Sequence, residues 1–301
     1  MDRLEQLEDD VKDLKTTVSF LRRQIDQLHQ EQQACRRPVE VSLQQRGLPV
    51  LSQGERGQLL LPHNATAVQR KSFYGCMQRY SFRLFLRDLI RFPQGDSIAS
   101  LTRYCSQKTA RSYLAYLSRM GVVYIYPDKS YRLVQNHISS FGPTLEWYVN
   151  EIFQREFLAP SIYNVRLEHT RYGGDYDVIS VLAEHLLYVE VKSSPPRGVE
   201  RPAVLAFMNR LQDLQPNMSV FLVDTELRMR DKMVPLFEEA LGQEDRNDED
   251  RRVVRLVNEI FHIRHSIYLI NSRKGIYSNL RLCVRDFLQW ERKTASAALK
   301  A

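Results

Sequence analysis

The sequence of 301 residues is poor in cysteine and in long apolar runs. Its four cysteines lie far apart without a CxxC pair, which disfavours both a disulfide framework and a zinc ribbon. No run approaches the ~18 apolar residues that a membrane-spanning helix needs. Charge begins at the second residue, which argues against a secretion signal. We therefore expect a protein of the reducing cytoplasm, without a membrane partner.

Motifs of the common hydrolytic enzymes are also absent. The sequence contains no P-loop, no GxSxG and no HExxH. Any ATP-driven step would therefore come from a partner protein that supplies an ATPase. The apolar content of 43% nevertheless supports folded cores, and the length suffices for two modest domains with an accessory segment.

Positive charge is concentrated in the middle of the chain. Residues 36–135 carry 16 Lys and Arg against 5 Asp and Glu, whereas residues 1–35 carry 5 against 8 and residues 136–301 carry 22 against 23. Lys and Arg release counterions from phosphates and steer encounter with polyanions, so this block favours a nucleic-acid partner. A solvated basic surface without a ligand is the alternative.

Residues 1–35 predict a coiled coil. Apolar side chains are spaced alternately three and four apart over four heptads, with no Gly or Pro between them. They are Leu4, Leu7, Val11, Leu14, Val18, Leu21, Ile25 and Leu28. So narrow a stripe favours self-association, most simply as a homodimer, over a helix that packs on its own globule. Residues 36–72 sustain no period and predict a linker with a short strand or two.

Residues 73–135 predict three helices followed by a strand pair. The helices are expected at 75–92, 96–105 and 106–121, and the strands turn about residues 127–129. This order resembles that of a winged helix-turn-helix domain, although such domains also serve as protein-interaction modules. The resemblance implies that the third helix enters the major groove of DNA while the hairpin meets phosphate. The implied contacts are Gln107, Lys108, Arg111, Ser112, Lys129 and Arg132.

Residues 136–301 alternate helical and strand patterns, which predicts an α/β fold with a mixed sheet flanked by helices. Helices are expected at 144–157, 201–214, 226–242 and 279–293. Strands are expected at 174–183, 185–194, 218–224, 257–263 and 266–272. We find no internal repeat that would indicate another architecture.

The first two of these strands place three charged residues together. If they form a hairpin across Glu184-His185, Asp177 lies opposite Lys192 and Glu190 lies opposite Ile179, with all three charges on one face. A three-residue turn would send Asp177 to the other face. A core avoids unpaired charge, so this arrangement indicates a site, and the hairpin register tests it.

Carboxylates with an ammonium suit phosphodiester hydrolysis. Mg²⁺ (or Mn²⁺) takes a couple of carboxylates, here Asp177 and Glu190, and leaves its other positions to water and phosphate oxygens. The Val191 carbonyl could complete the shell. Lys192 would orient the attacking water or stabilise the transition state.

These residues resemble the PD-(D/E)xK nuclease superfamily, most closely its Mrr-like and Holliday-junction-resolvase-like branches, over about residues 141–224. Asp177 matches the strand Asp of the superfamily, and Glu190 with Lys192 matches its E-x-K. The resemblance implies a further acid on the preceding helix, and Glu146 occupies that place. Asn209, Arg210 and Gln212 lie on the following helix, where some related nucleases keep a supporting polar residue.

Two features depart from the superfamily pattern. Tyr176 stands where its name-giving Pro would precede the strand Asp. Asp175 lies two residues before Asp177 on the same face and competes with it as metal ligand. An apolar strand follows Asp177 directly, which favours Asp177.

The sequence thus predicts a metal-dependent DNA endonuclease that dimerises through a coiled coil and reads duplex or branched DNA with a winged helix. Restriction, defence and repair all fit this interpretation. The alternative is a DNA-binding transcriptional regulator or accessory protein that keeps an inactive nuclease-like domain.

Overall fold

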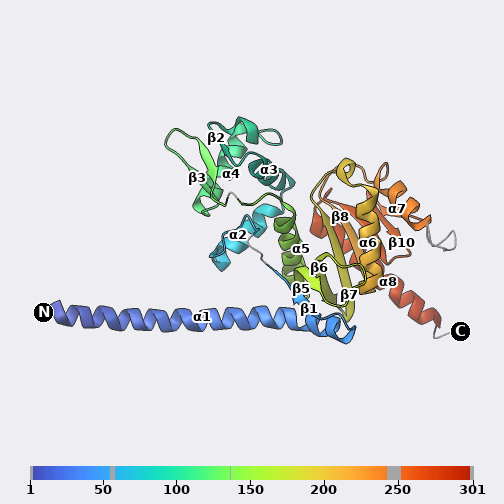
Figure 1. Ribbon diagram of the computed structural model, residues 1–301, viewed down its shortest axis with the longest axis horizontal. Coiled ribbons are helices and arrows are strands. Elements are labelled where there is room, and N and C mark those ends of the chain that lie inside the picture. Colours follow the sequence, from blue (N-terminus) through green and yellow to red (C-terminus); the bar gives the residue numbers. More distant parts are fainter. Residues whose placement is uncertain (1–2, 55–57, 136, 243–251, 299–301) are drawn as a thin grey trace.

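The computed structural model describes residues 3–54, 58–135, 137–242 and 252–298 of the chain. Within these ranges, an eight-stranded mixed sheet has the order β1-β5-β6-β7-β8-β11-β10-β9 (Figure 1). The pairs β7–β8 and β8–β11 are parallel and the others antiparallel. The strands are β1 (Val50–Ser52), β5 (Ser161–Leu167), β6 (Asp175–Leu182), β7 (His185–Lys192), β8 (Met218–Val223), β9 (Val254–Val257), β10 (Ile260–Ile263) and β11 (Ile267–Asn271). The expected mixed sheet is confirmed.

Helices cover both faces of this sheet, as expected. Helices α5 (Gly142–Glu156) and α8 (Ile276–Ala298) share a core with one face, and α6 (Arg201–Leu214) and α7 (Met233–Gly242) share a core with the other. Because both faces are covered, the central strands are apolar on both sides, and β8 is buried along its whole length. A short 3₁₀ turn, η2 (Pro196–Gly198), joins β7 to α6.

The three parallel strands end at one edge of the sheet. Lys192 ends β7, Asp224 follows β8 and Ser272 follows β11. The Asp224 N–H donates to the Lys192 carbonyl at 2.8 Å, and the Ser272 N–H donates to the Thr225 carbonyl at 2.8 Å. Ligand sites in such folds lie beyond the carboxyl ends of parallel strands, so we expect a ligand site at this edge of the sheet.

The middle of the chain forms a smaller helical unit with its own three-stranded sheet, β2-β4-β3. The elements are α2 (Ala67–Met77), α3 (Tyr80–Arg91), β2 (Gln94–Gly95), the 3₁₀ helix η1 (Ile98–Leu101), α4 (Gln107–Arg119), β3 (Val123–Ile125) and β4 (Tyr131–Leu133). The helix expected at 75–92 is divided, because Arg79 is extended between α2 and α3. The helix expected at 96–105 is one 3₁₀ turn, capped by Ser97. The helix expected at 106–121 is present, with Ser106 as its N-cap.

The first helix is longer than the coiled-coil pattern indicated. Helix α1 (Arg3–Gln45) continues through Pro38, and its last turns bury Val39 and Leu43 in the core that α6 and α7 cover. Residues 36–72, expected to form a linker, therefore end a helix, add β1 to the sheet edge and begin α2. Earlier in α1, large apolar side chains of the expected seam are exposed, namely Val11, Leu14, Val18 and Leu21.

The carboxyl-terminal part differs from the expectation in several places: strand β5 was not expected, and α8 extends beyond 279–293 at both ends. Helix α7 begins at Met233 rather than at 226, so Pro235 lies in its first turn, where the missing N–H costs no helical bond. The strand expected at 257–263 is a hairpin, with β9 and β10 joined across Asn258-Glu259. Among the described residues, no helix is long and apolar enough to cross a membrane.

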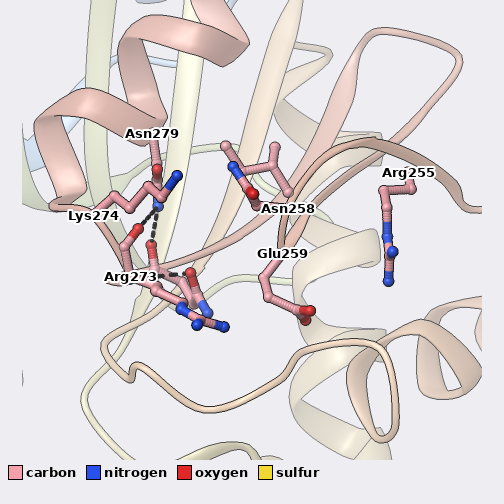
Figure 2. A pocket seen from close by; sticks show the side chains of 8 residues that line it. Arg255, Asn258, Glu259, Arg273, Lys274 and Asn279 are labelled. Atoms are coloured by element: carbon pink, nitrogen blue, oxygen red, sulfur yellow. Dashed lines mark hydrogen bonds between the residues drawn. The ribbon is translucent and has the colours of Figure 1, made fainter.

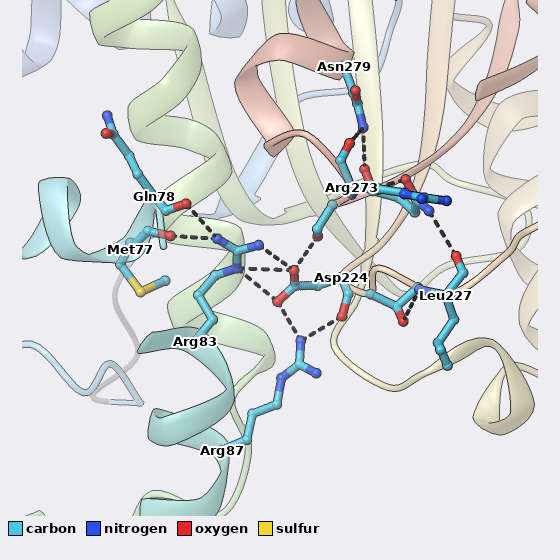
Figure 3. A network of polar contacts seen from close by, with 11 residues as sticks. Met77, Gln78, Arg83, Arg87, Asp224, Leu227, Arg273 and Asn279 are labelled. Atoms are coloured by element: carbon cyan, nitrogen blue, oxygen red, sulfur yellow. Dashed lines mark hydrogen bonds and ion pairs between the residues drawn. The ribbon is translucent and has the colours of Figure 1, made fainter. Parts of the chain in front are cut away.

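Buried charges join the helical unit to the sheet (Figure 3). Asp224 is fully buried and accepts hydrogen bonds from Arg83 Nε at 3.0 Å and Nη2 at 2.8 Å, from Arg87 Nη2 at 2.5 Å and from the Ser272 hydroxyl. Burial opposes the charge of this carboxylate, but the two guanidinium groups outweigh it and hold its pKa below the ordinary value. Arg83 is itself 1% exposed and also donates to the Met77 carbonyl at 2.7 Å.

We expect Arg83→Met to destabilise the folded chain by about 3–5 kcal/mol, because it leaves the buried Asp224 short of a partner. The thermal unfolding midpoint at pH 7 measures this loss. Arg166→Met is the matched control, since Arg166 pairs with Asp175 at an exposed position, where water screens the pair and its loss costs little stability. Equal losses in the two variants would contradict the role assigned to the buried pair.

Candidate active site

The β6–β7 hairpin carries the candidate site. Leu182 pairs with His185, so the turn consists of Ala183 and Glu184, one residue earlier than expected. Both turn residues have positive φ, +48° and +69°, as a type I′ hairpin turn requires. Neither is a favoured residue for such a turn, and the pairing of two long apolar strands holds them there.

The expected register is therefore wrong by one step. Tyr188, rather than Glu190, lies opposite Ile179, and the ladder brings Asp177 level with Glu190 instead of Lys192. The expected and observed turns both contain two residues, so the alternation of faces along each strand is unchanged. The three charged residues consequently stay together despite the shift.

Asp177 bridges the two strands where their regular pairing ends. Val178 and Val189 are the last paired residues, and beyond them Asp177 Oδ2 accepts a hydrogen bond from the Val191 N–H at 2.6 Å. The Asp177 carboxylate thus accepts the hydrogen bond that a main-chain carbonyl would accept in regular strand pairing. This bond holds the carboxylate beside the residues of the E-x-K sequence.

Glu190 is 1% exposed and its charge is compensated by two cations. Lys192 Nζ lies 2.6 Å from Oε1, and Arg210 Nη1 lies 3.1 Å from Oε1 and 3.0 Å from Oε2. The Tyr188 hydroxyl donates to Oε2. The Lys192 side chain is 27% exposed, so its ammonium joins the buried carboxylate to the surface.

A glycine turn gives Arg210 access to Glu190. Gly174 has φ +96°, and a Cβ at this position would lie 3.0 Å from Arg210 Nη2. Glycine alone combines this backbone conformation with space for the guanidinium group. The Gly173-Gly174 turn before β6 and the Arg210 side chain of α6 are thus fitted to each other.

Asp177 lacks the compensation that Glu190 has. Burial, with the Glu190 and Glu146 carboxylates, raises the pKa of Asp177 well above its ordinary value, while Lys192 and the Val191 N–H oppose the shift. Glu146, in the first turns of α5, therefore lies within electrostatic reach of the strand carboxylates. The site holds an excess of negative charge, which a bound cation would relieve.

Asp175, the competitor of Asp177, lies in a different environment. Its Oδ1 accepts a hydrogen bond from Arg166 Nε at 2.5 Å on the neighbouring strand β5, and both side chains are well exposed. The geometry thus brings Asp177, and not Asp175, into contact with the E-x-K segment. Tyr176, at the position of the missing Pro, is buried and packs against the Tyr188 ring at 5.5 Å.

The oxygen donors of the site suit a hard divalent cation. In the described ranges, no three side chains of His, Cys, Asp or Glu converge as a ready-made metal cage. Asp177 and Glu190, with the Val191 carbonyl, offer two carboxylates and one backbone oxygen. Such a partial shell fits Mg²⁺, which keeps several waters of its own.

The expected DNA contacts all lie on the surface of the helical unit. They are Gln107, Lys108, Arg111 and Ser112 on α4, with Lys129 and Arg132 in the β3–β4 hairpin. Arg111 and Lys129 line one pocket together with Asp96 and Asp128, so the amino-terminal part of α4 adjoins the hairpin tip. The basic side chains of helix and hairpin therefore share one surface.

Several residues of the site were not evident from the sequence. Tyr188 lies two residues before Glu190 on the same strand face, and this spacing is the signal that could have found it. Arg210 was noted among three polar residues of α6, and the structure selects it by its bonds to Glu190. Asn209 and Gln212 have no such bond, and Gln212 accepts from the exposed Tyr172 hydroxyl instead.

Comparison with known proteins adds little. No protein-family model matches the sequence, and no curated protein matches it. Protein VC1899 from Vibrio cholerae has a TM-score of 0.47 at 14% identity, over 84% of this chain and 61% of that one. Can2 from Sulfobacillus thermosulfidooxidans, solved in complex with cyclic tetra-adenylate, has a TM-score of 0.42 at 12% identity, over 80% of this chain and 59% of that one. The chain thus spans about three fifths of each, and neither likeness determines its function.

We expect Asp177→Asn to stabilise the chain in EDTA, and to do so more at pH 8 than at pH 5. The pKa of Asp177 is raised in the folded state, so the charged carboxylate costs stability as pH rises towards that pKa, and the cost disappears below the ordinary value of about 3.8. A gain of about 1 kcal/mol raises the unfolding midpoint by roughly 2–4 °C in a chain of this class.

Asp175→Asn serves as the control, because its exposed carboxylate has no such cost. Thermal unfolding of both variants at four or five pH values gives the comparison. A gain in stability for Asp177→Asn that stays constant from pH 5 to pH 8, or that falls with pH, would contradict the raised pKa of Asp177 in the folded state.

Proposed function

We propose that this protein is a metal-dependent DNA endonuclease of the PD-(D/E)xK type. The observation that supports the proposal is the convergence of Asp177, Glu190 and Lys192 where the β6–β7 pairing ends. Glu146 on the preceding helix adds a further carboxylate within electrostatic reach. Helix, Asp strand and E-x-K strand follow each other in the order that the superfamily uses.

Asp177, Glu190 and the Val191 carbonyl would hold Mg²⁺ or Mn²⁺. The raised pKa of Asp177 supports this assignment, because burial and the neighbouring Glu190 and Glu146 carboxylates disfavour its charge in the absence of a cation. A bound divalent ion would lower the pKa of a water molecule and neutralise charge on the phosphate that is attacked.

The protein's own residues have distinct roles in this proposal. Arg210 and the Tyr188 hydroxyl hold Glu190 in place, so the carboxylate is oriented before substrate arrives. Lys192 Nζ is partly exposed beside it and would orient the attacking water or stabilise the charged transition state. Glu146 would position water or favour the approach of the cation.

The basic helical unit would hold the DNA. An open groove of about 390 Å³ is lined by Arg87, Arg91, Ser139, Ser140 and Ser193, and Ser193 directly follows the proposed catalytic Lys192. This groove joins α3 to the carboxyl edge of the sheet. We infer that α4 and the hairpin act as a winged helix-turn-helix reader, with Lys129 and Arg132 on phosphates and Arg111 at base edges.

Self-association would provide two active sites. The exposed apolar seam of α1 suits a parallel coiled coil, and a homodimer sets one catalytic site against each strand of a duplex or branched substrate. A protein partner with an ATPase would supply any translocation. Restriction, defence and repair are all served by this activity.

One observation favours a second function. Both oxygens of Glu190 are already bound by Lys192, Arg210 and Tyr188, as in a structural ion-pair network. A DNA-binding regulator or accessory protein with an inactive nuclease-like domain would need no more than this. The uncompensated Asp177 is the feature that such a protein has no reason to keep.

We expect the purified protein to cut supercoiled, linear or branched DNA with Mg²⁺ or Mn²⁺ and not with EDTA. Asp177→Ala and Lys192→Ala should each reduce cleavage by at least a hundredfold, because each removes a group that acts on the reacting phosphate. Gel electrophoresis of time courses measures the rates.

Asp175→Ala is the matched control and should retain cleavage within about threefold. Circular dichroism melts establish that all variants fold. Undiminished cleavage in both Asp177→Ala and Lys192→Ala would refute the site. Tight DNA binding by the wild type without cleavage under any metal condition would favour the regulator.

We expect the chain to be a dimer that Leu14→Lys together with Val18→Lys converts to a monomer, since charge in an a/d seam opposes helix pairing. Light scattering coupled to size exclusion measures the mass in each case. Lys12→Ala with Lys15→Ala, on the same exposed part of α1 but outside the seam, should leave the dimer intact. A wild-type monomer at micromolar concentration would contradict the coiled coil.

A further inference from the structure

A second pocket lies beyond the carboxyl end of β11, at the same end of the sheet as the candidate active site. Figure 2 shows the side chains that line it. Its volume is about 330 Å³, and its lining includes Arg255, Asn258, Glu259, Arg273, Lys274 and Asn279. The β9–β10 turn forms one wall, and the loop between β11 and α8 forms the other. Neither the proposed chemistry nor the proposed DNA reader uses these residues.

The pocket is built to present positive charge. Arg255, Arg273 and Lys274 are exposed at its rim, and Arg255 lies 5.3 Å above the Phe261 ring. Glu259 is the acidic residue of the lining. Its Oε2 accepts hydrogen bonds from two backbone amides, those of residues 229 and 230, at 2.8 and 3.4 Å. Part of its charge is thus used within the fold, and the cations remain in excess.

The loop that carries two of these cations is held in a fixed shape. The Asn279 side chain, 4% exposed, donates to the carbonyls of Asn271 and Arg273 at 2.7 and 2.9 Å. The Asn271 side chain accepts from the Arg273 N–H at 3.1 Å and donates to the Leu227 carbonyl at 2.8 Å. Buried amide groups therefore place Arg273 and Lys274 at the rim in advance of any ligand.

Direct contacts connect this pocket to the proposed catalytic lysine. The Ser272 hydroxyl, next to Arg273, donates to Asp224, and the Asp224 N–H donates to the Lys192 carbonyl. Two strand spacings separate β7 from β11, which is about 10 Å. This distance is short enough for one DNA strand to contact the pocket and the candidate active site within a few nucleotides.

We propose that this pocket binds a backbone phosphate of the DNA strand whose scissile phosphate lies at Asp177, Glu190 and Lys192, a few nucleotides away. Arg273 and Lys274 pair with the phosphate from the β11–α8 loop, and Arg255 pairs with it from the β9–β10 hairpin. Asn258 offers a neutral hydrogen-bond donor. The subsite rests on the proposed DNA endonuclease and extends its contact surface along the sheet edge.

The test compares two double variants of equal charge. Arg273→Ala/Lys274→Ala removes two cations from the pocket, and Arg292→Ala/Lys293→Ala removes two exposed cations from the far end of α8. Fluorescence anisotropy with labelled duplex DNA in EDTA gives the affinity at several salt concentrations. We expect the pocket variant to bind on the order of tenfold more weakly and to lower the salt slope by about 1, because one phosphate contact is lost. The control should match the wild type.

Equal affinities and slopes in the two variants would overturn the subsite, as would a wild type that binds no DNA. Adenosine monophosphate serves as a second probe, which carries a phosphate but no DNA strand. A pocket variant that loses affinity for this nucleotide but not for DNA would also overturn the subsite. Cleavage with Mg²⁺ is measured separately on the same proteins. Weakened binding by the pocket variant with no wild-type cleavage would sustain the subsite and refute the nuclease. Wild-type cleavage with unchanged DNA binding by the pocket variant would support the nuclease and overturn the subsite.

Discussion

The buried carboxylate of Asp224 is the contact on which the arrangement of this molecule depends. It follows β8, in the middle of the sheet, and its charge is balanced by Arg83 and Arg87 from a helix more than 130 residues earlier. A buried charge without partners would cost several kcal/mol, so the sheet is completed only when α3 docks on it. That docking sets the basic helical unit beside the edge where β7, β8 and β11 end.

Neighbouring groups compensate the charges of the two strand carboxylates of the site to different degrees. Glu190 is surrounded by Lys192, Arg210 and Tyr188, which stabilise it in one orientation. Burial and two acidic neighbours act against the charge of Asp177, and Lys192 with the Val191 N–H offsets them only in part. The nuclease proposal rests on this difference, because a cation bound between the two carboxylates would offset the charge of Asp177.

The sheet edge unites these features. Glu190 and Lys192 lie at the end of β7 beside Asp177 of β6, the docking carboxylate follows β8, and the second basic pocket extends from the end of β11 to the β9–β10 turn. Parallel strands bring their carboxyl ends together, and the helices that follow them begin there. Cations from α3 and from the β11–α8 loop therefore lie at the same end of the sheet.

Local pattern in the sequence determined the alternation of helices and strands, the mixed sheet, and the grouping of Asp177 with Glu190 and Lys192. The period-two pattern sets strand faces whichever two residues make the turn. The turn position itself, the end of α1 and the division of the helix at Arg79 were decided by tertiary packing, since Val39, Leu43 and the β-ladder contribute energies that no local window contains. The partners of Glu190 and Asp224 were decided in the same way, because a charge is compensated by whatever the fold brings near it in space.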